Sequence, residues 1–151
     1  PRASSSLSMW ARTSFRRGKW NSRLPNSCAR KEATQVHKEI ANNVINEMEE
    51  KRREVRVQRD YLLKEEDFEG VDLVCSLGGD GTFLKTASMI KSSNLPIVGV
   101  NTDPARSVGH LTSIPIPFHE RSREVPRFID FLDQQNFKFD YKSRIKVSCK
   151  S

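Results

Sequence analysis

Residues 71–82 read VDLVCSLGGDGT. The first seven residues form an apolar run typical of a buried strand, and the residues after the run carry apolar side chains at helical spacing. The glycines in between let the backbone approach a ligand closely. A strand, a glycine-rich loop and a helix in this order predict a phosphate site, in which loop N–H groups and the helix N-terminus bind anionic oxygens.

Asp80 is the charged side chain of this loop. A lone carboxylate suits a metal ion or a proton from an attacking hydroxyl, so the loop predicts phosphoryl transfer to a hydroxyl group. Thr82 can cap the following helix. A tight glycine-rich connection without a ligand is the alternative, but glycines on both sides of Asp80 favour the site. The loop is neither a Walker loop nor the dinucleotide-binding fingerprint, because both motifs are absent from the chain.

A second apolar strand is predicted over residues 96–100, and the helix predicted over 82–91 connects it to the first. Two apolar strands joined by a helix indicate a parallel sheet with both faces covered and a right-handed crossover. The predicted fold class is therefore α/β, a partial Rossmann-like three-layer sandwich. The other predicted elements are a helix from about Lys31 with a stripe at Val36, Ile40, Val44 and Met48, an edge strand at 54–58, a short strand at 111–114, a helix at 125–132 and an antiparallel strand at 137–149.

A polar loop, 101–110, follows the second strand. Because the carboxyl ends of parallel strands meet at one edge of a sheet, this loop should face the glycine loop. Asn101 could bind a ribose or a phosphate, or it could be a strand-end turn residue. His110 could line the same cleft, or it could be a surface residue. His37 and His119 are assigned no role.

The net charge of +7 comes from residues 1–31, which hold eight Lys and Arg and no acidic residue, a charge of +8. The remaining chain has 18 basic and 19 acidic residues, a charge of −1, which argues against nucleic acid as a partner. No apolar stretch approaches the length of a membrane span, so no membrane partner is predicted. The three widely spaced cysteines indicate neither a disulfide framework nor a metal site, and they fit a reduced, intracellular protein.

The composition of residues 1–31, rich in Ser and Arg, is that of a disordered leader. It could be a mitochondrial transit peptide or an ordinary basic tail. The expected location is thus the mitochondrial matrix, with the cytoplasm as the alternative. The predicted domains are this leader, an α/β nucleotide-binding domain over 32–136, and the start of a truncated second domain over 137–151.

Three motifs together carry a family resemblance: Gly78-Gly79-Asp80-Gly81-Thr82, then Gly99-Val100-Asn101, then Gly109-His110-Leu111. In this order and spacing they resemble the NAD kinases. The loop over residues 101–107 resembles the mitochondrial type of animals in particular, although Val108 stands where that type has an acidic residue. The resemblance covers roughly residues 33–150, and no convincing match for the family's opening strand is found in the leader.

The resemblance implies transfer of the γ-phosphoryl group of ATP to the 2′-hydroxyl of NAD, which gives NADP. Asp80 corresponds to the aspartate placed to activate that hydroxyl. It also implies ATP with Mg²⁺ and a homodimer. The implied nucleotide-binding residues are Gly78, Gly79, Gly81, Thr82, Asn101, His110 and Leu111, of which His110 and Leu111 line the adenosine pocket.

Two alternatives stay open. The glycine motif is shared with lipid kinases of the diacylglycerol type, so the acceptor could be a lipid. The chain could also be an inactive nucleotide-binding fragment, because the second, β-rich domain of the NAD kinases has no counterpart in these residues. For the same reason we expect the 151-residue chain to be nearly inactive by itself.

Overall fold

A computed structural model describes residues 8–13, 27–59, 62–92, 94–135 and 137–145, with side chains from residue 35 onwards. In this part of the chain five parallel strands form one sheet in the order β2-β1-β3-β4-β5. The strands are β1 (Ser8–Thr13), β2 (Glu54–Arg59), β3 (Leu73–Leu77), β4 (Ile97–Asn101) and β5 (Ile114–Pro115).

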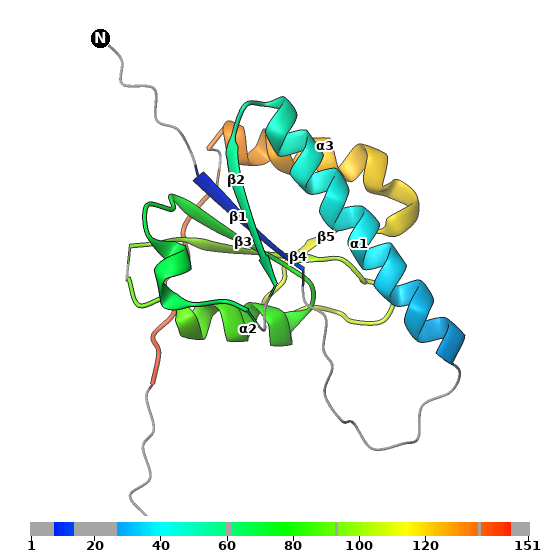
Figure 1. The fold of residues 1–151 in the computed structure, drawn as a ribbon, viewed down its shortest axis with the longest axis horizontal. Helices are drawn as coiled ribbons and strands as arrows, with labels where there is room; N and C mark the ends of the chain where they lie inside the picture. Colours follow the sequence, from blue (N-terminus) through cyan, green and yellow to red (C-terminus); the bar gives the residue numbers. More distant parts are fainter. Residues whose placement is uncertain (1–7, 14–26, 60–61, 93, 136, 146–151) are drawn as a thin grey trace, which may run out of the picture.

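Helices cover both faces of the sheet, as Figure 1 shows. The helices α1 (Ser27–Glu50) and α3 (Arg121–Asp133) pack together on one face, and α2 (Asp80–Met89) lies on the other. Short 3₁₀ turns occur at Glu65–Phe68 and Phe118–Glu120. The predicted three-layer α/β fold with a parallel sheet is confirmed.

The core divides at the sheet because consecutive strand residues point to opposite faces. Leu73, Cys75 and Leu77 of β3 pack on the face of the sheet that α1 and α3 cover, while Val74 packs on the opposite face of the sheet with Ile90. All five residues of β3 are buried, as expected for a strand covered on both sides. The predicted stripe of α1 is also confirmed, since Ile40, Val44 and Met48 are buried and Val36 packs against them.

The N-terminal segment departs most from the sequence-based prediction. The strand β1 lies between β2 and β3 and is paired with both through its backbone. Residues 8–13 are therefore not a disordered leader, and the helix predicted from Lys31 begins at Ser27. The pattern failed because the strand is short and surrounded by basic residues, and its pairing depends on neighbours far along the chain. Residues 1–7 and 14–26 lie outside the described residues.

This strand changes the domain boundaries. The α/β domain includes β1, so it does not begin at residue 32. Cleavage of a presequence near residue 31 would remove the strand that joins β2 to the rest of the sheet. A transit peptide within residues 1–31 stays a prediction, and β1 argues only against cleavage near residue 31.

The strand predicted at 111–114 is smaller and shifted. Only Ile114 and Pro115 pair with β4, because the backbone N–H groups of residues 110–112 bind the Asp80 side chain instead. Pro115, which follows the predicted strand, is part of β5 at the edge of the sheet, where a missing N–H is tolerated. The strand predicted at 54–58 is confirmed, as is its position at the opposite edge.

The antiparallel strand predicted at 137–149 is wrong for residues 137–145, which form no strand. They have no strand to pair with, and Phe139, Tyr141 and Ile145 are exposed. Arg144 instead donates hydrogen bonds from Nη1 to the carbonyl oxygens of Ala87 and Ile90 at 2.6 and 2.5 Å. A cation at this end of α2 is favoured by the helix dipole. Residues 146–149 lie outside the described residues.

Candidate functional site

The glycine loop and the loop after β4 meet at the carboxyl edge of the sheet, where the sequence predicted a site. Leu77 at the end of β3 pairs with Val100 of β4. The N–H group of Gly78 donates to the carbonyl oxygen of Val100 at 2.9 Å. Gly78 therefore continues the strand ladder, and its N–H group does not face a ligand.

The helix α2 starts within the glycine motif, two residues earlier than predicted. Its first residue is Asp80 and its N-cap is Gly79, with no side-chain capping bond. Thr82 is thus inside the first turn and is not the cap; its N–H group donates to the carbonyl oxygen of Gly79 at 2.9 Å. The first N–H groups of a helix lack partners within the helix, so those of Asp80 and Gly81 lie where an anion would be bound.

The carboxylate of Asp80 binds the loop that follows β4. Its Oδ2 atom accepts a hydrogen bond from the N–H group of His110 at 2.8 Å. Its Oδ1 atom accepts three, each 3.0 Å long, from the N–H groups of Leu111 and Thr112 and from the Thr112 hydroxyl. Asp80 therefore fixes residues 110–112 against the start of α2.

These contacts decide the charge of Asp80. Its partial burial favours the neutral acid, but the hydrogen bonds from Leu111, His110 and Thr112 favour the carboxylate and together hold the pKa of Asp80 below its ordinary value. The side chain is consequently ionised at neutral pH. It is a ready acceptor of hydrogen bonds and a weak base.

Asn101 performs the turn role that the sequence left open. Its Oδ1 atom accepts from the N–H group of Asp103 at 3.0 Å, and its Nδ2 atom donates to the carbonyl oxygen of Ser107 at 2.7 Å. The side chain is 1% exposed. Asn101 therefore holds the loop in shape from within, and a nucleotide contact by this side chain stays a prediction.

Backbone atoms bring His110 and Leu111 to Asp80, as the hydrogen bonds above show. The His110 side chain is exposed and that of Leu111 is half-buried. Thr112, which contributes two bonds to Asp80, is not recognised by sequence reasoning. It lies inside the strand predicted at 111–114, and no residue pattern distinguishes it there.

Comparison with known proteins identifies the family. Residues 19–130, well over half of the chain, match the ATP-NAD kinase N-terminal domain. The chain belongs to the NAD kinase family. The glycine loop, Asp80 and the loop after β4 all lie within the matched residues of this NAD kinase domain.

Individual relatives agree with the family match. A protein of Xenopus tropicalis named NAD kinase 2, mitochondrial, is 32% identical over 114 residues, which cover 74% of the chain and 25% of that protein. The Homo sapiens protein of the same name is 30% identical over 112 residues, covering 74% and 24%. An NAD kinase of Porphyromonas gingivalis is 38% identical over 80 residues, covering 53% and 25%. The chain spans about a quarter of the length of these relatives.

His37 is a second residue that sequence reasoning missed in this NAD kinase domain. It extends from α1 toward the loop after β4, where its Nδ1 atom lies 2.8 Å from the Thr102 hydroxyl oxygen. Its Nε2 atom is buried without a hydrogen-bond partner among the described residues. Burial lowers the pKa of His37, and the negative charge of Asp103 opposes that shift. The neutral imidazole is therefore the form that the fold accommodates.

This burial predicts a loss of stability at mildly acid pH. The pKa of His37 is lower in the folded than in the unfolded chain. The contribution of the neutral side chain to the free energy of unfolding is therefore full above the ordinary pKa of 6.5, and it is lost as the pH falls through the folded pKa. We expect the free energy of unfolding, measured with urea, to decrease from pH 7 to pH 5. The decrease should be smaller in His37→Gln.

The matched control is His119→Gln, since the His119 side chain is 79% exposed. We expect the decrease in the free energy of unfolding to be larger in His119→Gln than in His37→Gln. The pKa values of Asp80 and Glu124 are held below the ordinary carboxyl values by hydrogen bonds, so these groups lose their contributions to stability only at more acid pH. Equal pH dependence in His37→Gln and the wild type would contradict the assignment.

No metal-binding cluster is found in the described residues, since no three or more His, Cys, Asp or Glu side chains gather closely enough. The same part of the chain holds no helix that is both long and apolar enough to cross a membrane.

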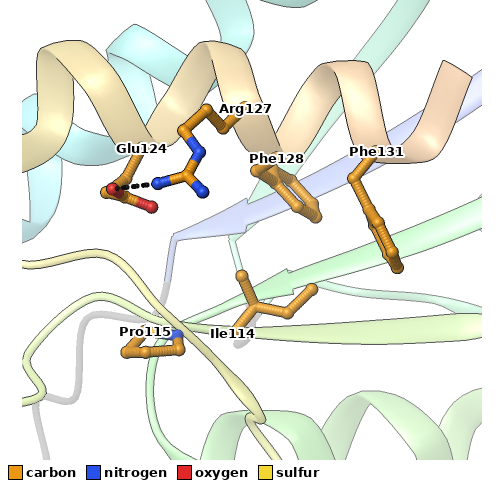
Figure 2. Close-up of a pocket in the computed structure, with 6 residues that line it drawn as sticks. All are labelled: Ile114, Pro115, Glu124, Arg127, Phe128 and Phe131. Carbon is orange, nitrogen blue, oxygen red and sulfur yellow. Dashed lines mark hydrogen bonds and ion pairs between the residues drawn. The ribbon is translucent and has the colours of Figure 1, made fainter.

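A pocket lies away from the glycine loop, between β5 and α3 (Figure 2). Phe128, Phe131 and Ile114 make it mostly apolar, and Arg127 and Glu124 form an ion pair at one end. None of the predicted site residues lines this pocket. We assign no ligand to it.

Proposed function

We propose that this domain serves an ATP-dependent NAD kinase, which transfers the γ-phosphoryl group of ATP to the 2′-hydroxyl of NAD. The observation that carries the proposal is the ionised Asp80 carboxylate at the first turn of α2, at the carboxyl edge of the sheet. Membership of the NAD kinase family supports the choice of NAD as the acceptor.

In the proposed reaction the 2′-oxygen of NAD forms a bond to the γ-phosphorus of ATP. The bond from this phosphorus to the β–γ bridging oxygen breaks, and ADP leaves with its electron pair. The hydroxyl proton passes to Asp80 and then to solvent. A carboxylate of lowered pKa is adequate because phosphoryl transfer relies mainly on positioning and on electrostatic stabilisation. The N–H groups at the start of α2 would offset negative charge on the transferring group.

Mg²⁺ is assigned to the ATP substrate in this proposal. The described residues supply no cluster of metal ligands. Mg²⁺ commonly binds through substrate phosphates and water. We propose that it arrives as the complex with ATP.

The remaining site residues and partners are part of the same proposal. Gly79, Gly81 and Thr82 border the space for the phosphates, and His110 and Leu111 border the adenosine. A homodimer is proposed from the family resemblance, and light scattering of the complete gene product would test it. The mitochondrial location named for the vertebrate relatives is proposed for this protein, and specifically the matrix. A tagged complete gene product that stays in the cytoplasm would contradict it.

The acceptor decides between NAD kinase and a diacylglycerol-type lipid kinase. The test supplies the complete gene product with ATP and Mg²⁺ and either NAD or diacylglycerol vesicles, and it detects NADP with an NADP-specific dehydrogenase. We expect phosphorylation of NAD and none of the lipid. Phosphorylation of diacylglycerol without NADP formation would refute the proposal.

The 151-residue chain is expected to produce little or no NADP in the same assay. Holding two substrates at reacting distance can account for roughly 7–11 kcal/mol of the barrier, and this chain spans about a quarter of the length of its relatives. Robust activity of the chain alone would show that the described site is sufficient. Absence of activity in the complete gene product would favour the inactive nucleotide-binding alternative.

A further inference from the structure

The hydrogen bonds to Asp80 are divided unequally between its two oxygens. Oδ1 accepts three, from Leu111 and from the N–H group and hydroxyl of Thr112, whereas Oδ2 accepts one, from His110. An ionised carboxylate has about four lone-pair positions, two on each oxygen, so two of the three donors on Oδ1 share a position. Oδ1 is therefore saturated, and Oδ2 retains a position for one further donor.

Thr112 is the rigid member of this group. Its side chain is 1% exposed. A Cβ atom added at Gly109, where φ is +66°, would lie 2.5 Å from the Thr112 hydroxyl oxygen, and one added at Gly99 would lie 2.9 Å from the Thr112 Cα atom. Two glycines thus make room for Thr112, and the close surroundings together with its β-branched side chain hold its hydroxyl in one orientation.

We propose that Thr112 is a positioning residue, which anchors Oδ1 of Asp80 so that Oδ2 is the oxygen presented to the acceptor hydroxyl. This inference rests on the proposed function, since it concerns the same carboxylate. The Thr112 hydroxyl would fix the carboxylate by a side-chain contact that the neighbouring N–H groups cannot replace. His110, whose side chain is exposed, lies on the side of Oδ2 where a substrate could enter.

The anchor has an electrostatic consequence that can be measured. The causes of the lowered pKa of Asp80 are its hydrogen bonds, opposed by partial burial, and no charged side chain is among them. Removing the hydroxyl should therefore raise the pKa of Asp80, while restoring a hydroxyl should restore it.

The test compares Thr112→Val, which keeps the shape but lacks the hydroxyl, with Thr112→Ser, which keeps the hydroxyl. In the complete gene product we expect Thr112→Val to lower kcat for NADP formation about tenfold, as for loss of one hydrogen bond to a charged group, with KM for NAD unchanged. Thr112→Ser should retain most of the wild-type kcat. Carbon-13 NMR titration of labelled aspartate should show a higher Asp80 pKa in Thr112→Val and a wild-type value in Thr112→Ser.

The outcomes separate this inference from the proposed function. Wild-type protein that makes no NADP would refute the function, whereas the Asp80 titration tests the anchor without any activity. An unchanged Asp80 pKa in Thr112→Val, or equal loss of kcat in the Val and Ser variants, would overturn the positioning role. If Thr112→Val does not fold, Thr112→Ala, which removes the same hydroxyl, takes the place of Thr112→Val in both measurements.

Discussion

A chain shortened to residues 32–151 begins at residue 32, the predicted start of the α/β domain. We expect this chain to show no cooperative unfolding transition. The shortened chain lacks β1, which pairs with β2 along its whole length and with β3 along most of it. Without β1 the edge strand β2 loses its partner in the sheet, and β3 becomes an exposed edge. Domains of this size are stable by only about 5–15 kcal/mol, so loss of the two ladders that join β2 to β3 through β1 should abolish the cooperative fold.

Urea unfolding followed by circular dichroism provides the measurement. The matched control is a chain of residues 8–151, which keeps every described helix and strand. We expect a single transition for residues 8–151 and a gradual, non-cooperative change for 32–151. A cooperative transition of similar midpoint in both chains would contradict the position of β1 in the sheet.

The second large effect is expected for Asp80→Asn in the complete gene product. We expect NADP formation to fall by at least about a hundredfold, the lower range for loss of a group that accepts a proton in the transition state. The amide would also disturb the loop, since its NH₂ group takes the place of one carboxylate oxygen and faces a backbone N–H group of residues 110–112. Both the proton acceptor and one loop contact are lost.

The control for this variant is Asp140→Asn. Asp140 forms an exposed ion pair with Lys142, and such pairs contribute about 0–1 kcal/mol, so its activity and thermal midpoint should match the wild type. A melting curve of Asp80→Asn shows whether the variant remains folded. A folded Asp80→Asn protein that keeps more than about a tenth of the wild-type rate would refute the proposed role, given the size of such effects.

Local patterns predicted the part of the fold that surrounds the glycine loop. β3, α2 and β4 each have a clear apolar period, and the order strand, helix, strand fixes a parallel pair with a right-handed crossover. β1 could not be found in this way, because it is short and is held by ladders to strands that begin more than forty residues later. The segment 137–145 failed for the opposite reason, since alternation alone does not form a strand without a partner.

In the candidate site, too, local patterns predict some residues, whereas others depend on contacts between distant segments. Asp80 is recognisable because a carboxylate between glycines is unusual in a strand–helix connection. The contacts of Asp80 with residues 110–112 depend on how two loops approach each other, and no spacing in the sequence encodes that approach. Thr112 and His37 were missed for this reason, because each becomes notable only through a partner from another element.

Identification of the phosphorylated product shows whether NAD is the acceptor and which hydroxyl reacts. The complete gene product would be incubated with NAD, ATP and Mg²⁺, and the product would be analysed by phosphorus-31 NMR. We expect ADP and one new phosphate monoester, on the 2′-position of the adenosine ribose of NAD, in equal amounts. Consumption of ATP without this monoester, or a phosphate at any other position, would contradict the proposed NAD kinase reaction.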